Sequence, residues 1–157
     1  MTNRTLPARD DFDRVRANTS QEVNRQLEAR AEQRIFAAAA GTRDPGSEVG
    51  ALDLEWDFER VMELEAAITG LTGLVLGVTV DRRFLIVPGV VAVMGLLHAT
   101  QGWYPMLPLF RRLGVRTQDE IDRERYAMKA LRGDFRNVRA EGEAAERAAA
   151  AWRAVCA

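Results

Sequence analysis

Apolar residues are concentrated in one stretch of this chain. Between residues 66 and 110 the only charges are those of the Asp-Arg-Arg sequence at 81–83, whereas both flanking regions carry many charges of either sign. A helix of 45 residues would be about 65 Å long, more than twice the roughly 30 Å of a bilayer core. Holding the three charges at mid-bilayer would cost about 3 kcal/mol each, so they must lie in a turn at the membrane surface. The pattern predicts a hairpin of two transmembrane helices, at about 61–80 and 84–102.

Both flanking regions show the sequence features of amphipathic helices. Thr19 with Glu22 forms a capping box, and a thin apolar stripe follows it until the glycines and proline of a linker near Gly41. A second capping box, Thr117 with Glu120, opens a strongly charged helix after the hairpin. We therefore expect an all-α chain with three parts. These are an N-terminal helical arm and linker at 1–46, a membrane hairpin region at 47–116 and a C-terminal charged helical arm at 117–157.

The segment from Ser47 has a helical pattern that can continue without a break into the first apolar helix. Trp56 and Phe58 would then lie near the membrane surface, where aromatic rings beside charged residues are common. The first helix has only 15 uncharged residues before the turn, so it spans the bilayer fully only if Glu63 and Glu65 lie among the headgroups. A tilted or re-entrant hairpin is the alternative.

Small residues recur at helical spacing along one face of each apolar segment. Close approach of two backbones along such faces is a main source of helix association in lipid, and Gly73 with Gly77 forms a GxxxG step. The faces could join within one hairpin or between copies of the chain. The candidate packing residues are Ala66, Gly70, Gly73, Gly77, Ala92, Gly95, Ala99 and Gly102.

Charge and cysteine content narrow the function classes. The net charge of −1 gives no basic excess of the kind that binds nucleic acid, so we expect no nucleic-acid partner. The single cysteine, Cys156, cannot form an internal disulfide or a cysteine metal cluster. The N-terminal segment is charged and has no apolar core, so we expect no signal peptide there. Neither a metal nor a cofactor is expected.

His98 and Gln101 are the polar candidates within the second apolar segment. Polar side chains at such depth often bind ligands, relay protons or pair helices, although pairing or interfacial placement is the plainer interpretation. Glu63 and Glu65 are two residues apart and do not face each other on a helix, which argues against concerted acid and base catalysis. The sequence shows no nucleophile with a nearby base and no phosphate-binding glycine loop, so we expect no catalytic residues and no enzyme.

Residues 55–135 resemble the YgaP-like transmembrane domain, a bacterial inner-membrane domain without an established activity. The resemblance rests on the glycine-rich first segment, the DRRFL turn, the HATQGW end of the second segment and the run PLFRRLGVRTQDEIDRERYAMKALRGDF. It implies a two-helix membrane hairpin, sometimes attached to a rhodanese domain. Such chains commonly carry Cys-Pro after the tryptophan, whereas this one has Trp103-Tyr104-Pro105. Thiol chemistry at that position is therefore not expected, and neither arm has the strand-helix alternation of a rhodanese.

These observations favour a non-enzymatic membrane protein that self-associates or anchors a cytoplasmic partner. Arginines at the outer ends of the hairpin outnumber those in its turn, which favours both termini in the cytoplasm of a multi-pass inner-membrane protein. The expected partners are the lipid bilayer, further copies of the chain and a cytoplasmic protein. Two other hypotheses stay open: a subunit of a small channel or transporter for an ion or sulfur-containing anion, and a soluble helical bundle with residues 66–110 as its core.

Overall fold

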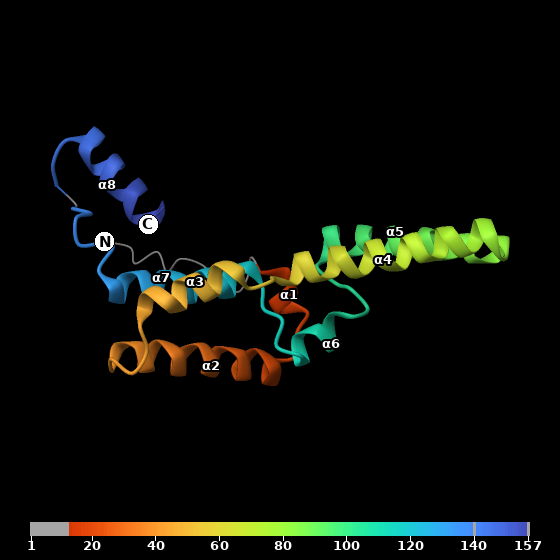
Figure 1. The fold of residues 1–157 in the computed structure, drawn as a ribbon, viewed down its shortest axis with the longest axis horizontal. Coiled ribbons are helices and arrows are strands. Elements are labelled where there is room, and N and C mark those ends of the chain that lie inside the picture. The colour runs from red at the N-terminus through yellow and green to blue at the C-terminus, as the bar shows by residue number, and fades with distance from the viewer. Residues whose placement is uncertain (1–12, 140, 157) are drawn as a thin grey trace, which may run out of the picture. The chain divides into compact units, whose positions relative to one another are not determined.

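The computed structural model describes residues 13–139 and 141–156, and all of its regular structure in these ranges is helical. The all-α prediction is confirmed. The α-helices in chain order are α1 (Arg14–Ala17), α2 (Gln21–Ala39), α3 (Pro45–Leu54), α4 (Phe58–Thr79), α5 (Ile86–Gln101), α6 (Leu107–Arg112), α7 (Gln118–Arg132) and α8 (Ala144–Cys156), as labelled in Figure 1.

The described residues form two compact units. The first contains 13–27 and 56–119, and the second contains 28–55, 120–139 and 141–156. The beginnings of both helical arms fall in the same unit as the hairpin. The physical reason is a shared core, in which Val15 of the N-terminal arm packs with three buried residues of the hairpin region, Phe58, Tyr104 and Leu107.

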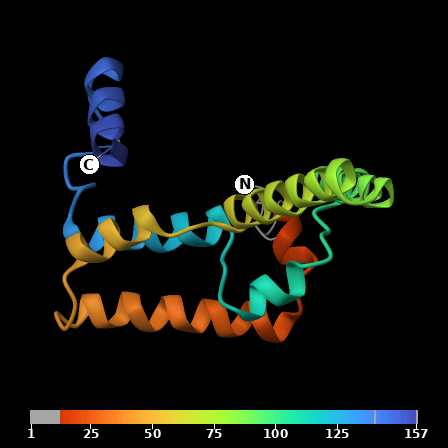
Figure 2. The ribbon, with the colours of Figure 1, turned by 45° about the vertical axis from the view of Figure 1, so that its right-hand side comes forward.

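The first unit is built around an antiparallel pair of helices, α4 and α5, which run side by side in both views (Figure 1, Figure 2). Asp57 caps the start of α4 by accepting a hydrogen bond from the main-chain N–H of Arg60 at 2.8 Å. The turn between the helices is the short 3₁₀ helix η2 (Arg82–Leu85), where the Asp81 side chain accepts from the N–H of Arg83 at 2.8 Å. By length and composition, two helices of the described structure could cross a membrane, one ending at Thr79 and the other extending over Arg82–Gln101.

The expected unbroken helix from Ser47 is interrupted at residues 55–57. Glu55 and Asp57 have extended backbone angles, so α3 ends at Leu54 and α4 begins at Phe58. Phe58 is fully buried, and its N–H donates to the carbonyl of Arg116 at 2.8 Å. Its ring therefore belongs to the core rather than to the membrane surface. Trp56 is partly exposed, with the Arg60 guanidinium 4.2 Å from its ring centroid.

The second unit has its own core, formed where parts of α2, α3 and α7 meet. Its buried apolar residues are Ala38, Val49, Leu52, Ile121 and Met128. The Arg34 guanidinium donates two hydrogen bonds, of 2.6 and 2.7 Å, to the buried carboxylate of Glu124. This bidentate ion pair ties α2 to α7 beside the apolar core.

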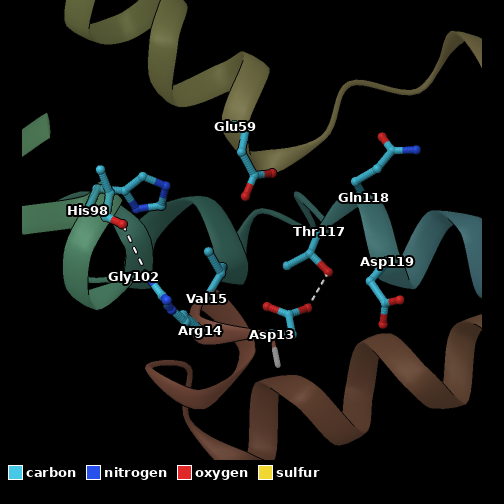
Figure 3. Close-up of a pocket in the computed structure, with 10 residues that line it drawn as sticks. Asp13, Arg14, Val15, Glu59, His98, Gly102, Thr117, Gln118 and Asp119 are labelled. Atoms are coloured by element: carbon cyan, nitrogen blue, oxygen red, sulfur yellow. Dashed lines mark hydrogen bonds between the residues drawn. The ribbon is translucent and has the colours of Figure 1, made fainter. Parts of the chain in front are cut away.

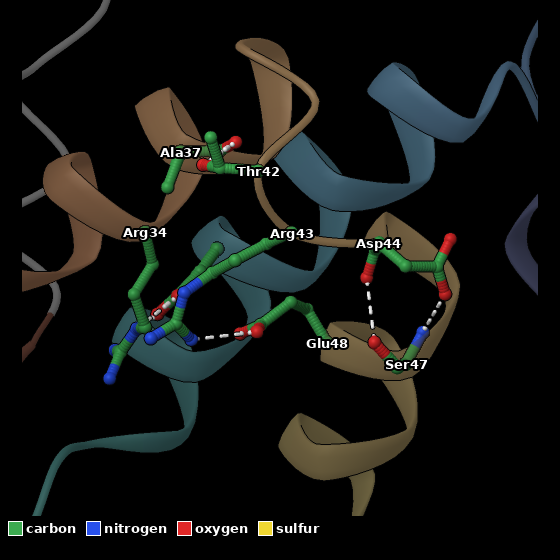
Figure 4. Close-up of polar contacts among 8 residues, drawn as sticks. Arg34, Ala37, Thr42, Arg43, Asp44, Ser47 and Glu48 are labelled. Atoms are coloured by element: carbon green, nitrogen blue, oxygen red, sulfur yellow. Dashed lines mark hydrogen bonds and ion pairs between the residues drawn. The ribbon is translucent and has the colours of Figure 1, made fainter.

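The linker between α2 and α3 is held by local polar contacts (Figure 4). Gly41 ends α2 in the left-handed region with φ +74°, which favours glycine. Asp44 caps α3 by accepting from the N–H of Ser47 at 2.7 Å, and Arg43 pairs with Glu48 at 2.8 Å. The predicted linker therefore has a defined conformation in which each of these side chains has a partner.

Candidate functional site

The two hairpin helices approach closely at Gly73 and Gly77. A Cβ added at residue 73 would lie 2.5 Å from Cβ of Val87, and one at residue 77 would lie 2.5 Å from Cδ2 of Leu85. Carbon atoms do not approach so closely, so both positions require glycine for this packing. The GxxxG step is therefore used inside the hairpin, whereas a Cβ added at residue 70 would lie 3.9 Å from Cγ1 of Val91, an ordinary contact distance.

The small residues of the second segment are placed differently. Ala92 and Ala99 are exposed, and a Cβ added at Gly95 would meet no atom within 4 Å. Gly102 packs on α1, where an added Cβ would overlap Cβ of Arg14. The contact between α4 and α5 therefore leaves Ala92 exposed, whereas Ala99 lies beside Arg14 of α1.

Large apolar side chains cover the outer faces of both hairpin helices. Leu71 is 62% exposed, Val78 is 75% exposed and Leu96 is 65% exposed. No residue of the most apolar stretch of the Arg82–Gln101 helix is buried. A monomeric water-soluble protein rarely leaves an apolar surface of this extent uncovered.

Helix α1 closes the end of α5. Nη1 of Arg14 donates to the carbonyls of Ala99 and Thr100, at 3.1 and 3.2 Å, and the Asn18 amide donates to the carbonyl of Gln101 at 3.0 Å. These are carbonyls of the last turn, which have no partner within the helix itself. A positive side chain at this end also complements the helix dipole. Gly102, in the left-handed region with φ +72°, ends α5, and α1 supplies donors to the last carbonyls of that helix.

Tyr104, just beyond α5, connects the end of that helix to α4. Its buried hydroxyl donates to Oε2 of Glu65 on α4 at 2.6 Å, and the other carboxylate oxygen accepts from the Thr69 hydroxyl at 3.0 Å. Burial and the hydrogen bond to Glu65 raise the pKa of Tyr104 to about 12. Glu65 is therefore part of a structural network rather than one half of a carboxylate pair with Glu63.

A pocket of about 630 Å³ lies within the first unit, where α5 ends and α4 begins (Figure 3). In Figure 3 the Glu59 carboxyl and the His98 ring point toward the same space from α4 and α5. Glu59 Oε2 and His98 Nδ1 are buried, and neither has a hydrogen-bond partner in the described part of the chain. The lining residues are Asp13, Arg14, Val15, Glu59, His98, Ala99, Gly102, Thr117, Gln118 and Asp119.

The surroundings of these two groups are well defined. The His98 ring lies 5.5 Å from the ring of Phe58 and 6.3 Å from that of Tyr104, between centroids. Burial raises the pKa of Glu59; a hydrogen bond from its own main-chain N–H partly offsets this, and the carboxylates of Asp57, Asp13 and Glu63 add to the increase. Glu59 lies seven residues before the uncharged part of α4, outside the stretch that could enter a bilayer core.

The pocket offers hydrogen-bond acceptors and an excess of negative charge. Three carboxylates line it, those of Asp13, Glu59 and Asp119, against the single guanidinium of Arg14, which donates to main-chain carbonyls of α5. Asp13 accepts from the Thr117 hydroxyl at 2.6 Å and from the N–H of Arg16 at 2.9 Å. Within residues 13–139 and 141–156, no group of three or more His, Cys, Asp or Glu side chains is arranged to hold a metal ion.

The two polar residues singled out in the sequence have different surroundings. His98 lines the pocket, whereas Gln101 is exposed and contributes its main-chain carbonyl to the contact with Asn18. The sequence analysis did not identify Glu59 as a pocket residue or Tyr104 as a neighbour of His98, and it did not predict α1. Asp13, three residues before the N–H that it caps, was the available signal for α1, but no local pattern revealed which helix α1 contacts.

Comparison of the chain with family models, curated proteins and solved structures gives no match.

Proposed function

We propose that this chain is a non-enzymatic membrane protein of the bacterial inner membrane, whose α4–α5 hairpin inserts in the bilayer and self-associates. The helical arms would lie on the cytoplasmic side and hold a protein partner. The resemblance of residues 55–135 to the YgaP-like transmembrane domain agrees with this proposal, and membership of that family is part of it.

The observation that carries the proposal is the uncovered apolar surface of α4 and α5. Leu71, Val78 and Leu96 are each more than half exposed, and all three lie on helices that are long and apolar enough to cross a bilayer. In the soluble-bundle hypothesis these side chains would form the core. Transfer into lipid instead removes the whole outer face from water, at about 25 cal/mol per Å².

The first test is membrane fractionation of tagged full-length protein. We expect the chain to resist carbonate extraction and to be released by detergent. Leu96→Arg places a charge in the middle of the second span, where insertion costs about 3 kcal/mol more, and should increase the carbonate-soluble fraction. Leu109→Arg is the matched control, because Leu109 is 47% exposed but lies beyond the hairpin. Release of the unmodified chain by carbonate would contradict the proposal.

Orientation can be read from the native cysteine. Cys156 is the sole cysteine of the chain and is exposed, so a membrane-impermeant thiol reagent reports the side on which α8 lies. With cytoplasmic arms, intact cells should leave Cys156 unlabelled, and lysed cells should label it. Arg83→Cys in a Cys156→Ala background should show labelling in intact cells, because Arg83 lies in the turn.

Self-association would use the outer face of α5, because Gly73 and Gly77 are already filled by Val87 and Leu85. Ala92→Cys in the Cys156→Ala background should form disulfide-linked dimers in membranes under mild oxidation. Val78→Cys, on the exposed face of α4, is the comparison position. Monomers alone, at every oxidant level and at both positions, would remove self-association from the proposal.

The channel hypothesis is not tested by these variants and stays a prediction. The polar residue of α5, His98, lies near the end of that helix, beside Phe58 and Tyr104.

A further inference from the structure

The pocket beside Glu59 and His98 contains two buried polar atoms with no hydrogen-bond partner in the described part of the chain, a carboxylate oxygen and an imidazole nitrogen that accepts when the other ring nitrogen carries the proton. Glu59 Oε2 comes from the first turn of α4 and His98 Nδ1 from the last turn of α5, so two separate elements direct acceptors at one space (Figure 3). A buried acceptor without a donor costs about 1–3 kcal/mol, and more if it is charged. Such groups in a cavity open to a ligand are an indication of binding.

The charge balance of the lining indicates the sign of the ligand. The carboxylates of Asp13, Glu59 and Asp119 exceed the one guanidinium, that of Arg14, so the pocket favours a cation. The described residues provide no set of three metal-binding side chains. A cation that meets a carboxylate oxygen and an imidazole nitrogen through hydrogen bonds must itself carry N–H donors.

We propose that this pocket binds a primary ammonium group, which donates one N–H to Oε2 of Glu59 and another to Nδ1 of neutral His98. An ammonium has three N–H donors and no acceptor, which matches a pocket that offers acceptors. The His98 ring contacts those of Phe58 and Tyr104, so the imidazole is positioned before the ligand arrives. Lysine-like amines, free ethanolamine and the headgroup of phosphatidylethanolamine share this chemistry.

The position of the pocket makes a lipid headgroup one natural source of the amine. His98 lies three residues before the end of α5, so in a membrane-inserted hairpin the pocket is at the level of the headgroups. The site itself is formed within one compact unit and does not require self-association. Its binding of a free amine can therefore be tested even if the hairpin is not in lipid.

The test follows thermal unfolding of the full chain, in nonionic detergent, by tryptophan fluorescence. Ethylammonium should raise the unfolding temperature in a saturable way, because a ligand of the folded state stabilises it by mass action. Tetramethylammonium has the same charge but no N–H and should not. Glu59→Gln should weaken ethylammonium binding at least about tenfold, as expected for loss of a charged hydrogen-bond acceptor. Glu63→Gln removes an equal charge from an exposed position of the same helix and should leave binding nearly unchanged.

His98→Phe gives a second variant that keeps the ring contacts with Phe58 and Tyr104 but lacks the nitrogen acceptor, and it should also weaken binding. The discrimination of the unmodified chain between the two ammonium ions does not depend on either variant folding well. Equal effects of ethylammonium and tetramethylammonium would overturn the proposal. Equal losses in Glu59→Gln and Glu63→Gln would overturn it as well.

The source of the amine is resolved in nanodiscs. Phosphatidylethanolamine, added to phosphatidylcholine discs, should stabilise the unmodified chain more than Glu59→Gln if the headgroup is the ligand. Stabilisation by free ethylammonium alone would identify a soluble amine. The absence of both effects in the unmodified chain would contradict the proposal.

Discussion

The hydroxyl of Tyr104 donates a 2.6 Å hydrogen bond to Oε2 of Glu65, so the segment after α5 is attached to the second turn of α4. Thr69 donates to the other oxygen of the same carboxylate. The contact lies at the open end of the hairpin, whereas Gly73 and Gly77 join its helices farther along. The hydrogen bond at one end and the glycine packing farther along together hold α4 against α5 over much of their length.

Removing the hydroxyl should destabilise the first unit. Tyr104→Phe leaves a carboxylate oxygen of Glu65 without its donor, and we expect a loss of about 1–3 kcal/mol in the free energy of unfolding. The measurement is unfolding by a denaturing detergent from mild micelles. Tyr126→Phe is the control, because Tyr126 is 40% exposed and should change stability by less than about 0.5 kcal/mol. Equal stability of the Tyr104→Phe variant and the unmodified chain would show that this bond contributes nothing.

The same bond predicts a dependence on alkaline pH. The pKa of Tyr104 is raised from 10.0 to about 12 in the folded chain, so between these values the unfolded state loses its proton first. The contribution of Tyr104 is therefore fully present below about pH 10 and is lost as the pH rises through about 12. The stability difference between the unmodified chain and Tyr104→Phe should shrink over this window. A constant difference would argue against the hydroxyl as the titrating group.

The glycines of the hairpin should differ in their tolerance of a methyl group. Gly73→Ala forces its Cβ against the branched carbon of Val87, and overpacking of this kind costs about 1–3 kcal/mol. Gly89→Ala meets nothing within 4 Å and should leave stability unchanged or slightly higher, since alanine favours the helix. Detergent-induced unfolding of both variants gives the comparison. If the two cost the same, the close approach of the helices at Gly73 is not what limits substitution.

The contact between α1 and α5 should be sensitive to Arg14. Arg14→Ala removes two donors from carbonyls of the last turn of α5, and we expect a loss of about 1–2 kcal/mol, similar to that of a helix cap. Hydrogen exchange of the α5 amides should show faster opening near Gln101. Arg30→Ala, at an exposed position of α2, is the control and should leave this exchange unchanged.

The ion pair of the second unit gives a prediction for the helical arms. Glu124→Gln leaves the Arg34 guanidinium opposite a neutral group and should cost about 3 kcal/mol, the lower end for a broken buried pair, because Arg34 is partly exposed. Glu22→Gln disrupts the exposed pair with Arg25 and should cost less than about 1 kcal/mol. Helical circular dichroism during thermal unfolding measures both. Equal losses would contradict the assigned difference in burial.

Local pattern accounted for much of the fold. The turn at residues 81–83 follows from three charges within an apolar run, and the ends of α2 and α7 near Gly41 and Gly133 follow from glycines with positive φ. The break before Phe58 escaped prediction because the sequence there keeps a helical pattern. At the break, the N–H of Phe58 donates to the distant carbonyl of Arg116 instead of continuing the helix, and Asp57 caps the start of α4.

The candidate site was harder to predict, because its residues come from four separate stretches of chain. His98 could be singled out as a polar residue in an apolar helix, but Glu59 looked like one charge among many before the hairpin. Their common feature, an acceptor atom buried without a donor, exists only when α4 and α5 are folded together. No residue spacing in the sequence indicates that Glu59 and His98 lie in the same pocket.

By itself, the sequence determined that this chain is all-α, that it has two apolar helices separated by a charged turn, and that polar helical arms flank them. Each of these is a property of neighbouring residues, since periodicity, charge and glycine act over a few positions. Only the tertiary structure decided that Gly73 and Gly77 pack within the hairpin, that α1 caps the last carbonyls of α5, and that Glu59 and His98 share a pocket. These depend on contacts between residues tens of positions apart, whose geometry is set by packing rather than by local preference.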